Sequence, residues 1–464
     1  MPERQFDLLV IGGGPGGYVA AIRAAQLGMK TAVIERDQLG GVCLNWGCIP
    51  TKALLKNAEV FTQFKHAGEW GISYQDLTFD FSKIIQRSRN VAKINSKGVE
   101  YLFKKNKIEH IAGFGKLLGN GKVDVSKDGK SQETVSAKHI VIATGARPRS
   151  LPNITIDRKQ IITSSEAMVL PSLPKSMVII GAGAIGVEFA YFYNAFGTKV
   201  TLVEMMPNIL PIEDKELSKL LESNFKKSGI EILTEAKVES VTTGKEVKVT
   251  VAAKDGKKEL KADVTLMAIG VQGNVENMGL ETVGVKVEKG WIQTDDFGKT
   301  NIPGVYAIGD VAGPPWLAHV ASKEGIICIE AMAGKNPQPI DYENIPGCTY
   351  CQPQVASIGM TEERAVAAGY QIKVGKFPFS ASGKARAIGE TDGLVKLIFD
   401  AKYGELLGAH ILGSEATEMI AELGVAKSLE TTASGFYNTI HAHPTLSEAI
   451  MEAAEQAYGH AIHI

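Results

Sequence analysis

Short apolar runs alternate with glycine-rich turns and mixed segments along this chain. Two of these runs, Phe6–Ile11 and residues 176–180, are each followed at once by closely spaced glycines and an alanine-containing segment. A second run, rich in β-branched residues, comes after each segment and ends in an acid, Glu35 or Glu204. The order of strand, glycine turn, helix and strand predicts two βαβ units, which places the chain in the α/β class.

The two units are an internal repeat with a constant offset of 169 residues, the separation of Gly12 from Gly181. In each turn the first glycine permits a tight bend, the second lets backbone approach a pyrophosphate, and the third lets helix and strand pack closely. The helix N-terminus attracts phosphate, and the acid can bind ribose hydroxyls. Two complete copies predict two dinucleotide sites rather than two structural turns. The matched positions are Gly12, Gly14, Gly17, Gly28, Lys30 and Glu35 with Gly181, Gly183, Gly186, Gly197, Lys199 and Glu204.

The acid of the second repeat also bears on the choice of nucleotide. A carboxylate at Glu204 would repel a 2′-phosphate, and residues 205–207 (Met-Met-Pro) supply no arginine to bind one. The sequence therefore favours NAD over NADP at this site.

A further strand lies beyond each repeat. Residues 140–145 read as a strand that ends in Thr144-Gly145, and residues 302–310 read as a strand that ends in a Gly-Asp turn. Asp310 could bind a cofactor hydroxyl, or it could cap a turn ahead of a helix predicted around residues 318–333. Both functions stay open from the residues alone.

The pattern changes from about residue 341. It becomes alternating strands with two helices, around residues 361–368 and 414–429, which indicates a separate C-terminal α+β domain. The chain then reads His-Ala-His443-Pro-Thr-Leu-Ser-Glu448 before a final helix. A neutral histidine can take a thiol proton near working pH, and an acid can orient its ring. His443 and Glu448 are therefore the candidate acid–base pair, and His441 is more often structural.

Composition excludes several classes of function. The 464 residues include 50 basic and 51 acidic side chains, and this balance gives no support to nucleic-acid or membrane-surface binding. There is no apolar run long enough for a membrane span, and the N-terminus leads straight into the first strand, so we expect no signal peptide. Five cysteines do not make a disulfide framework, which favours a reducing, cytoplasmic compartment and a catalytic use of any disulfide.

The most informative segment is residues 40–52, GGVCLNWGCIPTK. Its two cysteines, Cys43 and Cys48, begin eight residues after the first dinucleotide acid. Pro50 suits the first turn of a helix, which would place Cys48 near the positive end of the helix dipole and favour its thiolate. A dithiol beside a dinucleotide site predicts two-electron redox chemistry, whereas the alternative is a pair of buried core thiols.

The other three cysteines point to no site. Cys348 and Cys351 lie in a predicted strand, where residues three apart face opposite sides, and no second Cys/His pair has zinc spacing. We expect two ordinary thiols there, another in Cys328 on its helix, and no metal site.

Four segments together carry a resemblance to a known family: residues 40–52, GAGAIGVEFA at 181–190, AIGD at 307–310 and HAHPTLSE at 441–448. They resemble the FAD-dependent pyridine nucleotide–disulfide oxidoreductases over nearly the whole chain, and most closely the branch that oxidises protein-bound dihydrolipoyl groups. The resemblance implies FAD at the first repeat, NAD at the second, and an obligate homodimer. It also implies partners that carry lipoyl domains, in 2-oxoacid dehydrogenase or glycine-cleavage complexes.

The resemblance also divides the chain. It implies an FAD-binding domain in two parts, residues 1–147 and 271–340, around an NAD-binding domain at 148–270, with a dimerisation domain at 341–464. Family members often carry Arg-x-Pro-Asn after Gly270, where this chain has Val-Gln-Gly-Asn. Without this arginine and proline, the sequence does not predict the cofactor and interdomain contacts near Gly270.

Site residues carry over to the matching positions of this sequence. Cys48 would lie against the flavin, Cys43 would exchange disulfides with substrate, and His443 with Glu448 would reach the active site of the other subunit. Lys52 would lie near the flavin and pair with Glu188. The expected cofactor-binding residues are Gly12, Gly14, Gly17, Glu35, Lys52, Thr144, Gly145, Asp310, Ala318 and His319, together with Gly181, Gly183, Gly186, Glu188, Glu204 and Gly270.

Two alternatives remain. A related FAD disulfide reductase would act on a glutathione-like or other low-molecular-weight disulfide; glutathione-type reductases usually have Val-Asn-Val-Gly-Cys-Val-Pro where this chain has residues 44–50, and they carry a basic NADP-selecting site. A non-catalytic subunit would keep the fold for docking alone. The intact cysteines, His443 and Glu448 count against that second alternative.

Overall fold

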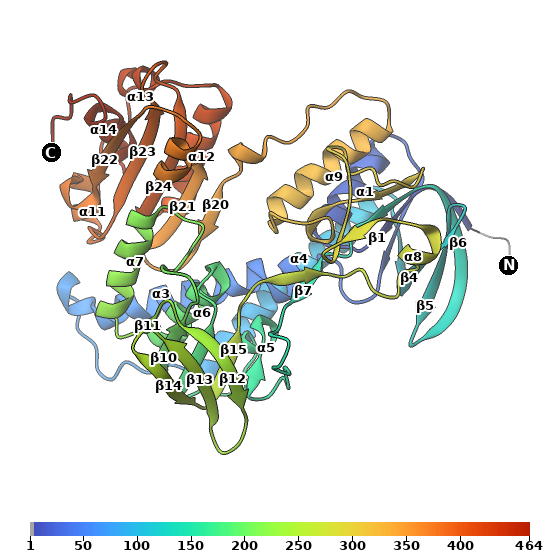
Figure 1. Ribbon diagram of the computed structural model, residues 1–464, viewed down its shortest axis with the longest axis horizontal. Coiled ribbons are helices and arrows are strands. Elements are labelled where there is room, and N and C mark those ends of the chain that lie inside the picture. The colour runs from blue at the N-terminus through green and yellow to red at the C-terminus, as the bar shows by residue number, and fades with distance from the viewer. Residues whose placement is uncertain (1–3) are drawn as a thin grey trace.

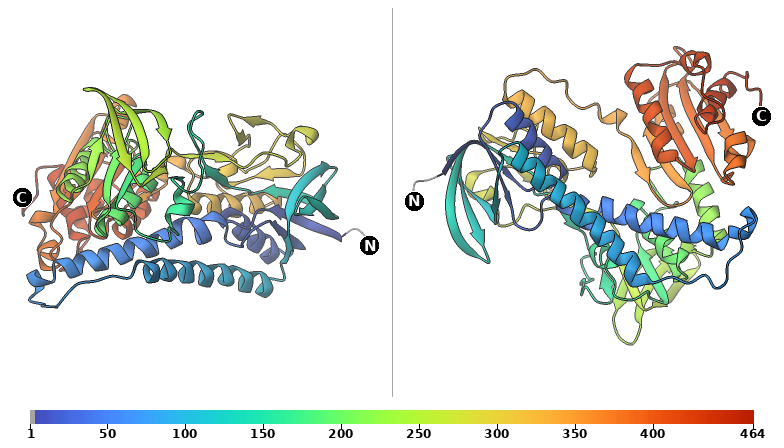
Figure 2. Two further views of the ribbon diagram at one scale, coloured as in Figure 1. Left: turned by 90° about the horizontal axis from the view of Figure 1, so that it is seen from below. Right: turned by 180° about the vertical axis from the view of Figure 1, so that it is seen from behind.

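The computed structural model describes residues 4–464, which form three sheet-centred units (Figure 1). The chain builds most of the first unit, crosses to the second, returns to complete the first, and then enters the third. Two long helices, α3 (Cys48–Lys65) and α4 (Phe81–Lys105), pack side by side beneath the first and second units (Figure 2). No helix within residues 4–464 is both long and apolar enough to cross a membrane.

The first sheet grows from the apolar run predicted at residues 6–11. β1 (Arg4–Ile11) lies between β2 (Thr31–Glu35) and β6 (Lys130–Ile142) and is parallel to both, so its side chains are buried on both faces. The helices α1 (Pro15–Gln26) and α9 (Ala318–Met332) pack together over one face. The remaining strands are β3 (Glu109–Ala112), β4 (Phe114–Gly119), β5 (Lys122–Lys127) and β19 (Val305–Ala307), the last of which pairs in parallel with β6.

The second sheet repeats this arrangement, as the 169-residue offset predicts. β9 (Ser176–Ile180) lies between β10 (Lys199–Val203) and β15 (Val264–Met267), all parallel, and α6 (Ala184–Ala195) packs against it with most of its side chains buried. The other elements of this unit are β8 (Ile161–Ile162), α5 (Ser164–Ala167), α7 (Lys215–Lys227), β11 (Glu231–Leu233), and the antiparallel strands β12 (Lys237–Thr242), β13 (Val247–Ala253) and β14 (Gly256–Ala262).

A two-stranded ribbon joins the first two units. It explains why this chain has Gly273 where family members often have proline. β7 (Ala146–Pro148) pairs antiparallel with β16 (Val271–Gly273), so the two crossings of the chain hydrogen-bond to each other. A Cβ on Gly273 would lie 2.5 Å from the Gly290 carbonyl oxygen and 3.1 Å from the Trp291 ring, so a proline has no room at this position. The small elements beyond the ribbon are α8 (Leu280–Val283), β17 (Val287–Glu288) and β18 (Trp291–Ile292).

The third unit is an antiparallel sheet of order β20-β21-β24-β23-β22. The two helices predicted from the sequence are α10 (Glu362–Ala367) and α12 (Ala416–Ser428), while two short helices, α11 (Gly383–Ala387) and α13 (Ala433–Asn438), were not predicted. Every residue of the central strands β23 and β24 is buried, because helices cover one face and the second unit approaches the other. The remaining elements are β20 (Gly347–Thr349), β21 (Gln354–Gly359), β22 (Ile372–Pro378), β23 (Leu394–Asp400), β24 (Leu406–Gly413), α14 (Glu448–Gln456), and the 3₁₀ turns η1 (Ala67–Trp70), η2 (Gly309–Val311), η3 (Tyr342–Asn344) and η4 (Phe379–Ala381).

Candidate active site

The first glycine turn closes on the acid of its own repeat. The Gly13 N–H donates to Glu35 Oε2 at 2.7 Å, which holds the carboxylate against the turn. A Cβ on Gly17 would lie 1.9 Å from the Gly12 carbonyl oxygen, so no larger residue fits there. Gly14 immediately precedes α1, whose first turn carries no acidic side chain. The free N–H groups of this helix end therefore suit a phosphate.

A cavity of about 260 Å³ opens beside this turn, and it suits the nucleoside part of a dinucleotide. Its lining includes Gly12, Glu35 and Thr144, which were expected from the sequence to bind the cofactor. The Thr144 hydroxyl donates to the backbone carbonyl oxygen of Asn274 at 2.9 Å, and Gly145 comes next with a positive φ of 68° that suits glycine. The lining also includes Arg147, which is paired at 2.6 Å with a glutamate and was not predicted from the sequence.

The second turn repeats the first. The Ala182 N–H donates to Glu204 Oε2 at 2.7 Å, and a Cβ on Gly186 would lie 1.9 Å from the Gly181 carbonyl oxygen. Gly183 precedes α6, whose first turn also lacks an acid. Gly270 has a φ of +102° with open space around it, so its backbone conformation rather than crowding favours glycine. The arrangement fits a second dinucleotide.

The two cysteines lie on consecutive helices. Cys43 is on α2 (Gly41–Trp46), and Cys48 is the first residue of α3, so Pro50 does lie in a first turn. Both are free thiols, and the Cys43 thiol hydrogen-bonds to the Cys48 sulfur. This bond, together with burial, raises the pKa of Cys43. The same bond and the nearby Lys52 ammonium hold the pKa of Cys48 below its usual range.

Lys52 pairs with a buried acid from the second unit. Its Nζ lies 2.9 Å and 3.0 Å from the two carboxylate oxygens of Glu188, whose side chain is only 5% exposed. The ammonium also lies 4.4 Å from the ring centroid of Tyr350, and the Tyr350 N–H donates to Glu188 at 3.0 Å. One ion pair therefore joins all three units beside Cys48. Tyr350 was not predicted, because a tyrosine in a strand region gives no local signal.

Asp310 does not serve as a helix cap. It lies inside η2, which is preceded by Ile308, and α9 is preceded by Leu317. The Gly309 N–H donates instead to Glu324 at 2.6 Å. Burial, reinforced by the charge of Glu324, raises the pKa of Asp310 to about 6. The neighbouring backbone N–H is thus already bonded to Glu324, and the buried Asp310 carboxyl group needs another partner. A cofactor hydroxyl would provide one.

Two further expected residues begin α9. Ala318 is its first residue, and His319, the second, is exposed. α9 lies closely against α1, since a Cβ on Gly325 would lie 2.8 Å from the Gly16 carbonyl oxygen. The start of α9 is therefore held in place against the helix that begins at the first glycine turn.

The candidate acid–base pair lies in the third unit. His443 Nδ1 is 2.9 Å from Glu448 Oε1, and the Thr445 N–H donates to Glu448 Oε2 at 2.7 Å. Burial acts to raise the pKa of Glu448, but these hydrogen bonds outweigh it and lower the pKa. The His443 side chain is 80% exposed, so it faces outward from this chain. His441 instead bonds to Glu422 at 2.9 Å, a structural contact.

The remaining three cysteines form no disulfide in the structure. The strand predicted through Cys348 and Cys351 ends at Thr349, and Cys351 lies in the turn beyond it, with its thiol 3.1 Å from the Pro353 carbonyl oxygen. Both are free, as is the buried Cys328. Among residues 4–464, no group of three or more histidine, cysteine or acidic side chains is placed to hold a metal ion.

Comparison with known proteins identifies the family. Residues 6–325 match the pyridine nucleotide-disulphide oxidoreductase model, and residues 345–454 match the dimerisation domain of the same enzymes. The chain belongs to this family. FAD and NAD are the cofactors of its dihydrolipoyl dehydrogenase members, and the dimerisation domain supports a homodimer.

Individual relatives cover the chain almost completely. It is 52% identical to a dihydrolipoyl dehydrogenase of Zymomonas mobilis over 463 residues, 99% of each chain, and 45% identical to that of Bacillus subtilis, again over 99% of each. Among solved structures, LpdA of Mycobacterium tuberculosis aligns with a TM-score of 0.90 at 28% identity, covering 97% of this chain and 99% of the other. The flavoprotein disulfide reductase RclA of Escherichia coli aligns with a TM-score of 0.88 at 28% identity, covering 98% and 99%.

Proposed function

We propose that this chain oxidises protein-bound dihydrolipoyl groups with NAD⁺, using FAD and the Cys43–Cys48 pair. One observation carries the proposal: two free thiols lie on consecutive helices beside the Lys52–Glu188 ion pair, with Cys48 as the first residue of α3. Cys43 and the Lys52 ammonium hold the pKa of Cys48 below its usual range. A relay between a substrate dithiol and a flavin needs such an acidic thiol. The relatives named dihydrolipoyl dehydrogenase support the substrate.

The two glycine turns support an assignment of the cofactors. We propose FAD at Gly12, Gly14, Gly17 and Glu35, and NAD at Gly181, Gly183, Gly186 and Glu204. A cavity of about 260 Å³ beside the first turn and the absence of a basic side chain at residues 205–207 favour this order. The further FAD contacts are Lys52, Thr144, Gly145, Asp310, Ala318 and His319, and the further NAD contacts are Glu188 and Gly270.

The same assignment implies a division of the chain. We place the FAD-binding domain at residues 1–147 and 271–340, the NAD-binding domain at 148–270, and the interface domain at 341–464. The return of β19 to the first sheet supports the two-part FAD domain. The boundaries fall near the β7–β16 ribbon, where the chain crosses between units.

The proposed reaction begins with proton removal at His443. The Nδ1 atom of His443 is bonded to Glu448, so Nε2 is the atom that takes a proton from a substrate thiol. The resulting substrate thiolate attacks the sulfur of Cys43 in a Cys43–Cys48 disulfide and releases Cys48 as a thiolate. The second substrate thiol then displaces Cys43, which closes the lipoyl ring and leaves Cys43 protonated. Glu448 stabilises the histidine cation that forms.

The reduced pair is then held ready for electron transfer. The Cys43 thiol stabilises the Cys48 thiolate by a hydrogen bond, and the Lys52 ammonium lowers the pKa of the Cys48 thiol. Bound beside Cys48, FAD would supply the two-electron carrier between the thiolate and NAD⁺. Glu188 keeps Lys52 in place, since its carboxylate lies within 3.0 Å of the ammonium.

The partners are part of the same proposal. His443 is exposed and is therefore free to contact a second copy of the chain. In a homodimer, His443 and Glu448 would complete the active site of the other subunit. The reduced substrates would be lipoyl domains of 2-oxoacid dehydrogenase or glycine-cleavage complexes. Five cysteines in 464 residues make no disulfide framework, which favours a reducing compartment, and we place the protein in the cytoplasm.

A direct comparison of substrates tests the proposal. The purified protein should form NADH from dihydrolipoamide and NAD⁺, and it should oxidise NADPH with glutathione disulfide at a negligible rate. The reverse preference would assign it to the low-molecular-weight disulfide reductases. A protein that binds no flavin and catalyses neither reaction would be a docking subunit instead.

A further inference from the structure

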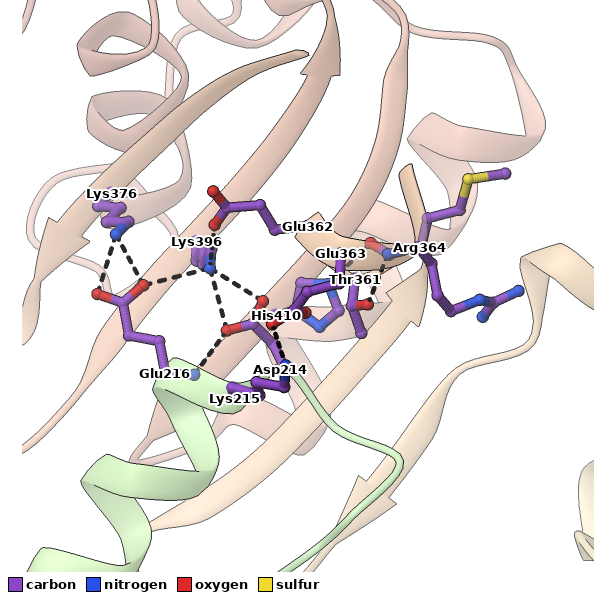
Figure 3. A network of polar contacts seen from close by, with 11 residues as sticks. Asp214, Lys215, Glu216, Thr361, Glu362, Glu363, Arg364, Lys376, Lys396 and His410 are labelled. Atoms are coloured by element: carbon purple, nitrogen blue, oxygen red, sulfur yellow. Dashed lines mark hydrogen bonds and ion pairs between the residues drawn. The ribbon is translucent and has the colours of Figure 1, made fainter. Parts of the chain in front are cut away.

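An ion cluster centred on a buried lysine joins the second and third units (Figure 3). Lys396 on β23 is 3% exposed, and its Nζ lies 2.9 Å from Asp214 Oδ2, 3.2 Å from Glu216 Oε2 and 2.7 Å from Glu362 Oε2. Asp214 is 1% exposed. Glu362 belongs to the third unit, whereas Asp214 and Glu216 begin α7 of the second unit. The reaction described above uses none of these residues.

The cluster is connected to the second glycine turn by a short loop. Glu204, the acid of the turn, directly follows β10, and residues 205–213 lead from it to Asp214. Midway along the loop, the Leu210 N–H donates to the Ala182 carbonyl oxygen at 2.8 Å, which ties the loop to the turn itself. Ile209 and Leu210 are buried in the core of the second unit. The loop is therefore held at both ends, by Glu204 and by Asp214.

The Asp214 carboxylate makes two kinds of contact at its end of the loop. The Asp214 carboxylate caps α7 by accepting from the Glu216 N–H at 3.0 Å, and it accepts two bonds from Lys396, at 3.0 Å and 2.9 Å. The first contact lies within the second unit. The second contact fixes the loop to the third unit, and a buried ion pair of this kind is strongly sensitive to the loss of one partner.

From this geometry we propose that Lys396 is a positioning residue for nucleotide binding at the second glycine turn. By holding Asp214, it fixes the loop that presents Glu204 and the adjoining backbone to the nucleotide. The third unit, which matches the dimerisation domain, thereby sets the affinity of a site in the second unit. This inference rests on the proposed assignment of the second turn to NAD.

A pair of matched variants separates positioning from stability. The double substitution Asp214→Asn with Glu216→Gln removes both second-unit carboxylates, while asparagine still caps α7 and Lys396 keeps Glu362. The control Glu362→Gln also removes a carboxylate partner of the Lys396 ammonium, but the loop stays attached to Lys396 through Asp214. Asp214→Asn alone is the milder form, should the double variant fail to fold.

The primary measurement is the dissociation constant for NADH, from fluorescence titration of the FAD-loaded dimer. We expect it to rise roughly 5-fold or more in the double variant, in the range of ordinary coupling energies, and to stay within about 2-fold of wild type in the control. KM for dihydrolipoamide should remain within about 2-fold in both. Backbone amides of residues 205–213 should exchange faster only in the double variant.

Other outcomes would overturn the inference. Wild-type NADH affinity in the folded double variant, or in folded Asp214→Asn, contradicts a positioning role. Equal weakening in Glu362→Gln, or a matching rise in KM for dihydrolipoamide, would make the cluster merely structural. If the wild-type protein itself binds no NADH, the proposed function fails, a result distinct from either of these.

Discussion

The glycine turn at residues 12–17 and the turn at residues 181–186 make the same hydrogen bonds. The carboxylate of Glu35 accepts from the N–H groups of Gly13 and Asp37 at 2.7 Å and 2.8 Å. The carboxylate of Glu204 accepts from the N–H groups of Ala182 and Met206 at 2.7 Å and 2.9 Å. The two turns therefore differ little in how they present backbone and acid to a nucleotide.

The two repeats differ in the segment that comes after each acid. Both segments return to their turn, since the Gly40 N–H donates to the Gly13 carbonyl oxygen and the Leu210 N–H to the Ala182 carbonyl oxygen, each at 2.8 Å. After Gly40 the first segment enters the helices that carry the thiols. After Leu210 the second segment reaches Asp214 and the ion cluster. In both repeats the turn thus fixes the start of a loop. The first loop leads to the redox thiols, and the second leads to the ion cluster that attaches the second unit to the third.

The largest expected effect comes from the thiols, which only the first loop carries. Cys48→Ser should lower the rate of NADH formation by at least about 1,000-fold, because the electron relay is broken. FAD should remain bound, and NADH affinity should be unchanged. The control Cys348→Ser alters a half-buried thiol outside the pair and should keep its rate within about 2-fold of wild type. Substantial activity in Cys48→Ser would remove the thiols from the reaction.

Substitutions at the third glycine of each turn should separate the two sites. An added Cβ would lie 1.9 Å from a carbonyl oxygen in both Gly17→Ala and Gly186→Ala, so each turn must open to make room and should bind its nucleotide roughly 100-fold more weakly, about 3 kcal/mol. Gly17→Ala should lose FAD, measured by flavin absorbance after dialysis. Gly186→Ala should keep FAD and lose NADH binding, measured by fluorescence. The opposite pattern would exchange the two assignments.

The first unit has a second acid beside its cofactor turn, Asp310, which follows β19. Its folded pKa of about 6 lies above the ordinary value of 3.8, so this group contributes stability at low pH that is lost as pH rises through about 6. The loss is up to about 3 kcal/mol. In flavin-free protein, Asp310→Asn should flatten the pH dependence of the unfolding free energy between about pH 4 and 7, as measured by urea denaturation. An unchanged slope would show that the carboxyl group is not destabilised by burial.

The smallest effect concerns the acidity of Cys48 in the reduced protein. Cys43→Ala removes the hydrogen bond that is the largest cause of the low pKa, so the pH midpoint of Cys48 alkylation should rise by about one unit or more. Glu188 acts to raise the pKa of Cys48, so Glu188→Gln should move the midpoint down. Mass spectrometry of the alkylated peptide reports both shifts. Shifts of the same sign would contradict the electrostatic account.

Much of this architecture is predictable because it depends on local rules. In both repeats the backbone passes so close to a carbonyl oxygen that only glycine fits. The glycines and the acid that follows them therefore recur at a recognisable spacing in the sequence. The order of Cys43, Cys48 and Pro50 likewise encodes a helix start. The candidate acid–base pair, His443 and Glu448, is separated by only five residues, so its members could be recognised together.

Apart from the Lys52–Glu188 pair, which the family resemblance implied, the contacts between units were not predictable. Asp214 and Lys396 are 182 residues apart, and each stands in a segment whose composition is ordinary for a helix or a strand. Arg147 and Tyr350 were missed for the same reason. Asp310 could be assigned neither to capping nor to a cofactor from sequence, since the choice depends on Glu324, which supplies the bond to the Gly309 N–H. Such features arise from tertiary packing and leave no periodic signal.

A single-turnover experiment tests the central claim, that two similar turns bind the two cofactors that successively receive electrons from one dithiol. Oxidised protein is mixed without oxygen with one equivalent of dihydrolipoamide, and NAD⁺ is then added. The wild type should form about one NADH for each Cys43–Cys48 pair, whereas Gly186→Ala should gain two titratable thiols and form no NADH. NADH formation by Gly186→Ala, or failure of wild-type Cys43 and Cys48 to become reduced, would contradict the account.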